Sequence, residues 1–150
     1  MKYLIASLFL LFLVSSCTKK KAEQQAITDD QIIQQYIADN DLTAVKASSG
    51  LYVVVENPGT GASCNSFSTV KVAYTGYFTN GEIFDASPLA GVDFSLQSVI
   101  SGWTSGIPYF KEGGYGKLLI PSALGYGPSG SGSIPPNTVL VFDVKLIQVL

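Results

Sequence analysis

Apolar and polar residues alternate along much of the chain after residue 50, which is the pattern of β-strands. The segment at residues 69–78 shows this best, because Val70, Val72 and Tyr74 face one side and the residues between them face the other. The same reasoning predicts further strands at residues 51–55, 82–85, 94–96, 117–120 and 138–150. The chain from Leu51 onward is therefore predicted to be mainly β-sheet.

The connections between these strands favour antiparallel pairing. Asn80-Gly81 predicts a tight type I′ hairpin turn. Helical spacing appears in this part only at residues 99–110, and Pro108 should shorten or kink that helix because it lacks a backbone N–H. The predicted fold class is α+β, a twisted antiparallel β-sheet of about five strands wrapped around one short α-helix.

The first 48 residues carry different patterns. Residues 1–17 hold a basic start, a short apolar run and small residues, as secretory signal peptides do. Residues 18–26 are polar without a period and predict a tether. Thr28 and Gln31 have the spacing of a helix N-cap, so a short helix is expected to follow and to end near Asp39. This gives a signal at 1–17, a tether with a short helix at 18–48 and one domain at 49–150.

The last residues of the signal resemble the bacterial lipobox. Val14-Ser15-Ser16-Cys17 places a cysteine where cleavage would fall, and the resemblance implies that Cys17 is lipidated. The alternative is an ordinary cleaved signal with an incidental cysteine. We expect an exported chain anchored to a bacterial membrane, the outer membrane being favoured because no Asp follows Cys17. Cys64 would then be a lone structural thiol.

Composition excludes several classes of chemistry. The chain has 9 basic and 11 acidic residues, so its formal charge of −2 gives no footprint for nucleic acid. It contains no histidine, which excludes Ser-His-Asp and Cys-His nucleophile systems and the usual zinc sites. We therefore expect no metal and no cofactor. Gly125-Tyr126-Gly127-Pro128-Ser129-Gly130 matches a dinucleotide-binding spacing, but no helix can follow it, so a loop is predicted there.

A series of short motifs occurs in one order across residues 49–150. They are Val72-Ala73-Tyr74-Thr75-Gly76, residues 80–87, Val99-Ile100-Ser101-Gly102-Trp103, residues 119–127, Ile134-Pro135-Pro136-Asn137 and Leu140-Val141-Phe142-Asp143-Val144. In order and spacing this series resembles the FKBP family of peptidyl-prolyl cis–trans isomerases. The resemblance implies an FKBP-like sheet curled over one helix, with a pocket between them.

The resemblance also implies the site residues. The residues that would line the pocket are Tyr74, Phe84, Val99, Ile100, Trp103, Tyr126, Ile134 and Phe142, with Trp103 as the floor. The family's pocket aspartate falls on Asp85, and the tyrosine that hydrogen-bonds the substrate carbonyl falls on Tyr126. The backbone N–H of Ile100 would hold a second carbonyl. Each apolar residue could alternatively be plain core.

These residue types suit prolyl isomerisation, which breaks no bond. The barrier of about 18–20 kcal/mol comes from the double-bond character of C–N, so a dry aromatic pocket can favour the twisted amide. The expected partners are proline-containing polypeptides, with a macrolide as a candidate inhibitor, and the chain is expected to be a monomer. The alternatives are a non-catalytic peptide-binding or holdase module that uses the same groove, and a purely structural lipoprotein.

Overall fold

The computed structural model describes the backbone of residues 2–150 and the side chains of residues 18–150. Its α-helices are α1 (Lys2–Asp39) and α2 (Ser101–Gly106), and its 3₁₀ helices are η1 (Ile107–Tyr109), η2 (Ser122–Leu124) and η3 (Gly127–Ser129). Its strands are β1 (Val45–Lys46), β2 (Tyr52–Asn57), β3 (Thr69–Tyr77), β4 (Ile83–Ala86), β5 (Val92–Ser95), β6 (Tyr115–Ile120) and β7 (Leu140–Val149).

The strands form one antiparallel sheet, as the α+β prediction requires. Its order is β1-β2-β6-β7-β3-β4, and β5 also pairs with β3. The sheet has seven strands rather than about five. The strand that was not predicted from the sequence is β1. Its two residues pair with Val53 and Tyr52, and they are too few to show an alternating pattern.

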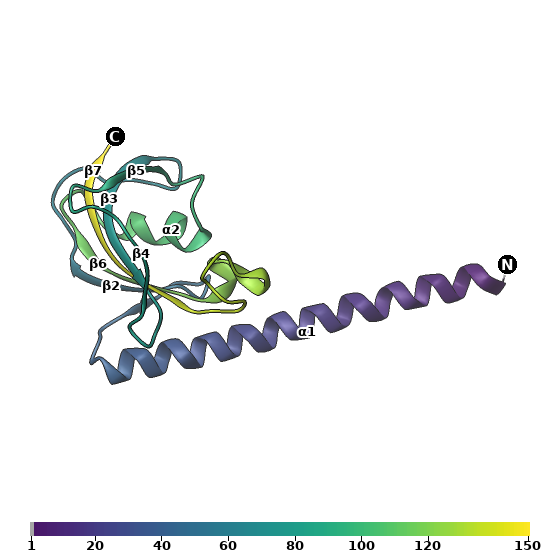
Figure 1. The fold of residues 1–150 in the computed structure, drawn as a ribbon. Coiled ribbons are helices and arrows are strands. Elements are labelled where there is room, and N and C mark those ends of the chain that lie inside the picture. Colours follow the sequence, from purple (N-terminus) through teal and green to yellow (C-terminus); the bar gives the residue numbers. More distant parts are fainter. Residues whose placement is uncertain (1) are drawn as a thin grey trace.

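The sheet curls around α2, as Figure 1 shows. The inner face of β7 carries Leu140, Phe142, Val144 and Leu146, all buried in a core that also includes Trp103 of α2. Two glycines let α2 lie close to β6, because a Cβ on Gly102 would sit 2.6 Å from Ile120 and one on Gly106 would sit 2.7 Å from Leu118. The helix can therefore approach closely enough to form one wall of a pocket.

The helix predicted within residues 99–110 is short, as the position of Pro108 led us to expect. It begins at Ser101, ends at Gly106 and continues as the single 3₁₀ turn of η1, with Pro108 near the start of that turn. The missing N–H of proline stops the α-helical ladder there. Ile100 becomes the residue before the helix, with extended backbone angles of φ −59° and ψ 147°.

The turn at Asn80-Gly81 is a different turn from the one predicted. Gly81 has φ 88°, but Asn80 has no positive φ, which a type I′ turn would need. The loop instead has three residues, closed by hydrogen bonds from Gly81 N to Phe78 O (2.8 Å) and from Phe78 N to Glu82 O (2.9 Å). Asn80 contributes through its side chain, which accepts a bond from Glu82 N at 3.0 Å.

Helix α1 is longer than the short helix predicted from Thr28 to Asp39. The residues predicted to form a tether before it are part of the same helix. Residues 18–26 are helical, and Thr28 is no N-cap, since its hydroxyl donates to Gln24 O at 3.0 Å. Lys, Ala, Glu and Gln fill this segment and are strong helix formers, so the helix needs no apolar period there. The helix ends at Asp39 as expected, with Asp41 at φ 52° in the left-handed conformation common after helices.

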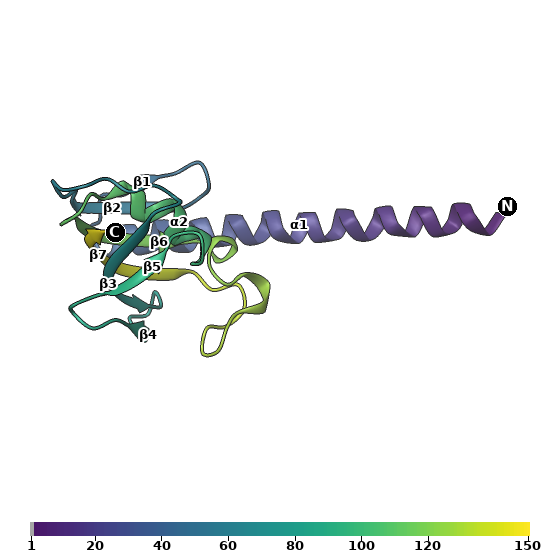
Figure 2. The same cartoon turned by 90° about the horizontal axis from the view of Figure 1, so that it is seen from above.

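The C-terminal part of helix α1 packs on the outer face of the sheet, opposite α2 (Figures 1 and 2). Ile33 is buried there with Tyr52, Leu119, Val139 and Val141, and Tyr36 and Ile37 pack at the edge. This second cluster explains why both faces of β2 are buried at residues 52–54, in the first half of the strand. The predicted signal at 1–17 and the lipidation predicted at Cys17 fall on residues whose side chains the structure does not describe.

Candidate functional site

A cavity of about 460 Å³ opens between the sheet, the start of α2 and the loop after η2. Ten side chains line it: Tyr74, Phe84, Asp85, Phe94, Ser98, Val99, Ile100, Trp103, Tyr126 and Phe142. Eight of the nine pocket residues expected from the sequence are in this set. The ninth, Ile134, is buried in the core and does not line the cavity. Residues that lie up to 68 positions apart in the sequence, from Tyr74 to Phe142, therefore meet at one place.

Trp103 is the centre of the aromatic part of this cavity. Its ring lies nearly perpendicular to three neighbours, with centroid distances of 5.0 Å to Tyr74, 5.3 Å to Phe94 and 5.5 Å to Phe142. Phe84 extends the cluster through a similar contact of 5.5 Å with Phe142. Edge-to-face contacts hold aromatic rings in defined positions, so the walls of the cavity are rigid.

The indole N–H of Trp103 is an unusual feature of the site. It is buried, and among the described residues it has no hydrogen-bond partner. An unpaired buried donor costs about 1–3 kcal/mol, so proteins seldom keep one without a reason. Trp103 therefore lines the cavity with its ring, while its N–H makes no hydrogen bond to the described residues.

Tyr74 and Asp85 supply the polar part of the wall. The Tyr74 hydroxyl donates a hydrogen bond of 2.7 Å to Asp85 Oδ2. Burial raises the pKa of Tyr74 to about 12, and the bond to Asp85 adds to the effect. The hydroxyl therefore remains protonated and keeps donating to the carboxylate throughout the physiological pH range.

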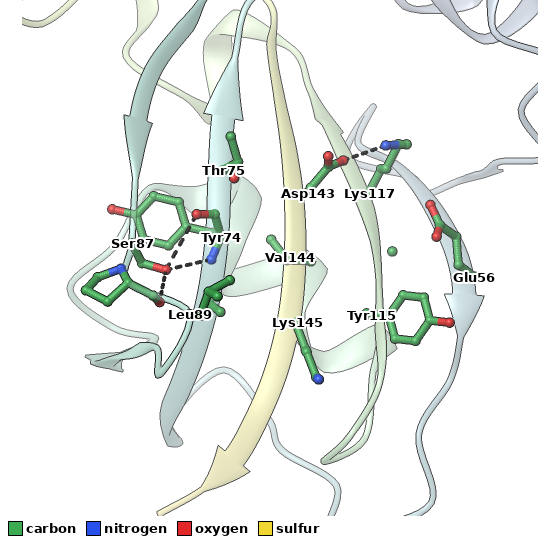
Figure 3. Close-up of a pocket in the computed structure, with 13 residues that line it drawn as sticks. Glu56, Tyr74, Thr75, Ser87, Leu89, Tyr115, Lys117, Asp143, Val144 and Lys145 are labelled. Carbon is green, nitrogen blue, oxygen red and sulfur yellow. Dashed lines mark hydrogen bonds and ion pairs between the residues drawn. The ribbon is translucent and has the colours of Figure 1, made fainter.

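Ser87, which follows β4, fixes the backbone of Tyr74 in the neighbouring strand β3. Figure 3 shows its hydroxyl against the Tyr74 backbone, with Tyr74 N donating to Ser87 Oγ at 2.9 Å. A second hollow, of about 590 Å³, lies on the outer face of the sheet. Its lining residues are drawn in the same figure, and among them Lys117 pairs with Asp143 at 2.6 Å. That hollow is lined by a half-buried ion pair and no aromatic cluster, so the inner cavity is the stronger candidate site.

Two groups at the rim of the inner cavity can donate hydrogen bonds. The side chain of Tyr126 is 39% exposed. The Ile100 N–H precedes the first turn of α2 and, within the described chain, donates to no backbone carbonyl. An extended peptide could reach both groups from solvent.

Sequence reasoning missed three residues of this site. Phe94 and Ser98 line the cavity, and Phe94 contacts both Tyr74 and Trp103. Gly76 lies behind the wall, where an added Cβ would come within 2.7 Å of the Phe84 and Phe142 rings. Phe94 was visible only as a strand residue, because its role depends on the pairing of β5 with β3.

Two absences concern the part of the chain that the structure describes. No group of three or more Cys, Asp or Glu side chains lies close enough together to hold a metal ion. In that part of the chain, no helix combines the length and apolar character that crossing a membrane requires.

The family model and the relatives described below point to the same protein family. The model of the FKBP-type peptidyl-prolyl cis–trans isomerase domain matches residues 61–147, more than half of the chain. A protein named FKBP-type peptidyl-prolyl cis-trans isomerase FkpA from Aeromonas hydrophila is 42% identical over 140 residues, covering 91% of this chain and 52% of that protein. FkpA of Escherichia coli K12 is 37% identical, again with 91% and 52% covered.

Solved structures agree with this result. The crystal structure of FkpA from Escherichia coli is similar with a TM-score of 0.73 and 36% identity, covering 91% of this chain and 66% of that one. A peptidyl-prolyl isomerase from Pseudomonas syringae pv. tomato gives a TM-score of 0.71 and 34% identity, with 85% and 94% covered. The fold and the aromatic site define an FKBP-like isomerase domain. The chain belongs to the FKBP-type peptidyl-prolyl cis–trans isomerase family, and it spans about half the length of the curated FkpA relatives it matches.

Proposed function

We propose that this chain is a peptidyl-prolyl cis–trans isomerase that accelerates rotation about X–Pro bonds in exported proteins. The observation that carries the proposal is the cavity floored by Trp103 and walled by Tyr74, Phe94 and Phe142. It is large enough for a proline ring and its neighbours, and it presents aromatic surface to them. The isomerase names of the matched relatives support the same reaction class.

The physical task is to lower a rotational barrier. The planar amide is polarised and water stabilises it, whereas the twisted amide has lost resonance and is less polar. An apolar cavity that removes water from the imide therefore favours the twisted state over the planar one. The Trp103 indole, buried and ringed by aromatic side chains, provides the surface against which the proline ring would rest.

Polar groups at the rim supply orientation. The Tyr126 hydroxyl would donate to one substrate carbonyl and the Ile100 N–H to another, which holds the flanking backbone in a turn. Asp85, held by Tyr74, would place negative charge beside the carbonyl carbon of the twisting imide. Val99, Phe84 and Ile100 complete the apolar wall.

The size of the required effect is modest. Uncatalysed prolyl isomerisation takes about 10–100 s, and bringing it to milliseconds is a factor of about 10⁴. That factor corresponds to about 5.4 kcal/mol of barrier lowering at 1.36 kcal/mol per decade. Desolvation with two or three positioned contacts can supply such an amount, and neither a nucleophile nor histidine is needed.

The test is a proline-peptide isomerisation assay on the purified chain and three variants, Asp85→Ala, Tyr126→Phe and Phe142→Ala. Each variant should lower kcat/KM by at least about tenfold while near-native circular dichroism is retained. The matched control is Tyr109→Phe, which changes an exposed tyrosine outside the cavity and should leave the rate unchanged. Equal rates in the three site variants and the parent would overturn the proposed site.

The same assay separates catalysis from mere binding. A holdase that uses the groove would suppress aggregation of proline-free and proline-containing clients alike, with no gain in isomerisation rate. No observation in the structure favours that alternative. Competition by a macrolide is an additional expectation, since the aromatic cavity would accept such a ligand, and it would appear as inhibition of the peptide assay.

Export and anchoring form the second part of the proposal. The signal-like residues 1–17 and the lipobox-like sequence before Cys17 support a lipid anchor in a bacterial membrane, with the outer membrane favoured. Lipid chains hold a protein at a membrane because each buried CH₂ contributes about 0.8 kcal/mol. Labelled palmitate should enter the parent chain and not Cys17→Ala, which should be released from the membrane fraction; labelling of the variant would contradict the anchor site.

We also propose that the chain is a monomer. The apolar face of α1 is covered by its own sheet, because Ile33 is 1% exposed and Tyr36 and Ile37 pack beside it. The face of the helix that carries Ile33 is therefore not available to a second copy. Sedimentation of the purified chain should give the monomer mass, and a dimer would refute this assignment.

A further inference from the structure

A buried carboxylate on α1 lies outside the lining of the cavity described above. Asp29 is 0% exposed and lies one helical turn before Ile33 on the face that packs against the domain. Its Oδ1 accepts a hydrogen bond from Gln25 Nε2 at 2.7 Å. Its Oδ2 accepts two more, from Ser122 N at 2.8 Å and from Ser122 Oγ at 2.6 Å. Burying a carboxylate is costly unless it is paired or hydrogen-bonded, so these three bonds are what allow it to lie there.

The partner of Asp29 begins the short helix η2. Backbone N–H groups at the start of a helix have no partner within the helix and need an external acceptor. The residue before η2 is Pro121, whose side chain has no polar atom, and η2 has no side-chain cap of its own from that position. Asp29 supplies the acceptor from 93 residues earlier in the sequence.

The segment that Asp29 fixes leads directly to the cavity. Helix η2 ends at Leu124, Gly125 is its C-cap, and the next residue is Tyr126, which stands between η2 and η3. The Tyr126 side chain is 39% exposed, so the path of its backbone sets its position. On its other side the loop is closed by a bond of 2.9 Å from Asn137 N to Gly127 O.

We infer that Asp29 is a positioning residue, which acts through Ser122 and η2 to hold the Tyr126 hydroxyl at the rim of the cavity. The inference rests on the isomerase function proposed above. It makes α1 a part of the active domain as well as a connection toward the N-terminus. Displacing the helix from the sheet would then reduce activity without any change in the aromatic wall.

The test is a double-mutant cycle on the full chain with Asp29→Ala and Tyr126→Phe. Asp29→Ala alone should lower kcat/KM about tenfold, since small misplacements of an orienting group are costly. In the Tyr126→Phe background the same substitution should change kcat/KM by less than about twofold, because the group through which Asp29 acts is already gone. Equal losses in both backgrounds would show a general structural effect and overturn the inference.

The neighbouring carboxylate provides the matched control. Asp30 lies on the same helix and pairs with Lys46 at 2.6 Å and with the Tyr52 hydroxyl at 2.8 Å, on the side of β1 and β2. Asp30→Ala should leave kcat/KM within about twofold of the parent in either background. If Asp29→Ala does not fold, Asp29→Asn and Ser122→Ala replace it in the cycle, since each preserves part of the contact.

A second readout is independent of catalysis. The backbone amide resonances of Gly125 and Tyr126 should shift or broaden in Asp29→Ala and stay unchanged in Asp30→Ala. An inactive parent enzyme would refute the proposed function, and these resonances would then decide the positioning role alone. Unchanged resonances in Asp29→Ala would overturn it.

Discussion

Tyr74 combines two roles at the scale of a single residue. Its ring packs against Trp103 at 5.0 Å, and its hydroxyl holds Asp85 at 2.7 Å. Burial is the main cause that raises its pKa to about 12. A group with this shift binds its proton more tightly in the folded chain than in the unfolded chain, whose tyrosines titrate near pH 10.

This shift predicts how stability depends on alkaline pH. Between about pH 10 and 12 the unfolded chain loses the Tyr74 proton while the folded chain keeps it, so the free energy of unfolding should fall as pH rises. The contribution is complete below pH 10 and lost as pH rises through 12. In urea unfolding series, Tyr74→Phe should show a shallower decline over that window than the parent does.

Part of the decline should remain in that variant. Burial, followed by a hydrogen bond with Tyr36, also raises the pKa of Tyr77, so this second tyrosine contributes in the same direction. Parallel declines for the parent and Tyr74→Phe would contradict the assignment of the shift to Tyr74.

Gly76 supports the cavity by being small. An added Cβ would lie 2.7 Å from both the Phe142 and Phe84 rings, so Gly76→Ala must push at least one ring away. Overpacking of this kind costs about 1–3 kcal/mol of unfolding free energy. We expect that loss in urea unfolding, together with a kcat/KM reduced at least about tenfold in the peptide assay.

The control for this substitution is the preceding residue of the same strand, Thr75. Thr75 lines the hollow on the outer face of the sheet and not the inner cavity, so Thr75→Ala should leave kcat/KM close to the parent value. Gly76→Ala with an unchanged rate would show that the positions of Phe84 and Phe142 are not important for catalysis.

Helix α1 contributes to the stability of the fold through the one face that packs on the sheet. Ile33 is 1% exposed in the outer cluster, whereas the adjacent Ile32 is 38% exposed. Truncating a fully buried isoleucine removes apolar burial and leaves a cavity, so Ile33→Ala should lower the free energy of unfolding by about 2–4 kcal/mol. Ile32→Ala deletes the same atoms from a more exposed position and should cost less than about 1 kcal/mol.

Urea unfolding monitored by Trp103 fluorescence measures both variants. The indole lies in the inner core, so it reports the unfolding of the whole domain and not of the helix alone. Equal costs for Ile33→Ala and Ile32→Ala would mean that α1 does not pack on the sheet as described.

The elements differ in how far the sequence could predict them. The alternation of Val70, Val72 and Tyr74 predicted their shared face correctly, because a strand with one apolar side has a clear period. Residues 18–26 were wrongly predicted to be a tether, since a polar helix that contacts little has no apolar period to read. Asn80-Gly81 gave the right hairpin and the wrong turn, because two turn types favour the same glycine.

The site was predicted where short motifs carry it. Tyr74, Asp85, Trp103 and Phe142 all belong to motifs resembling one family, and the structure gathers them around one cavity. Phe94 belongs to none of these motifs, and it reaches the cavity because β5 pairs with β3. Asp29 gave no signal, because its contact with Ser122 joins segments whose proximity no local pattern reveals.

At the scale of the whole molecule, the sheet has two cores that share strands. β6 contributes Leu118 and Ile120 to the inner core and Leu119 to the outer cluster, and β7 likewise contributes Phe142 to one and Val141 to the other. Packing of α1 is therefore coupled to the strands that carry the cavity. The helix should open from the sheet at a free energy not far below that of global unfolding.

Hydrogen exchange tests this coupling along a single helix. The side chains of residues 19–24 are all exposed, and a helical segment with little burial is marginal in water, so their amides should exchange rapidly. Amides of residues 33–39 should be protected to nearly the level of β7, because they open only when the outer cluster does. Ile33→Ala should remove much of that protection from 33–39 while β7 loses only what the lower global stability explains. Uniform exchange along the whole of α1 would mean that the helix behaves as one independent unit and that its contacts with the sheet add nothing to its stability.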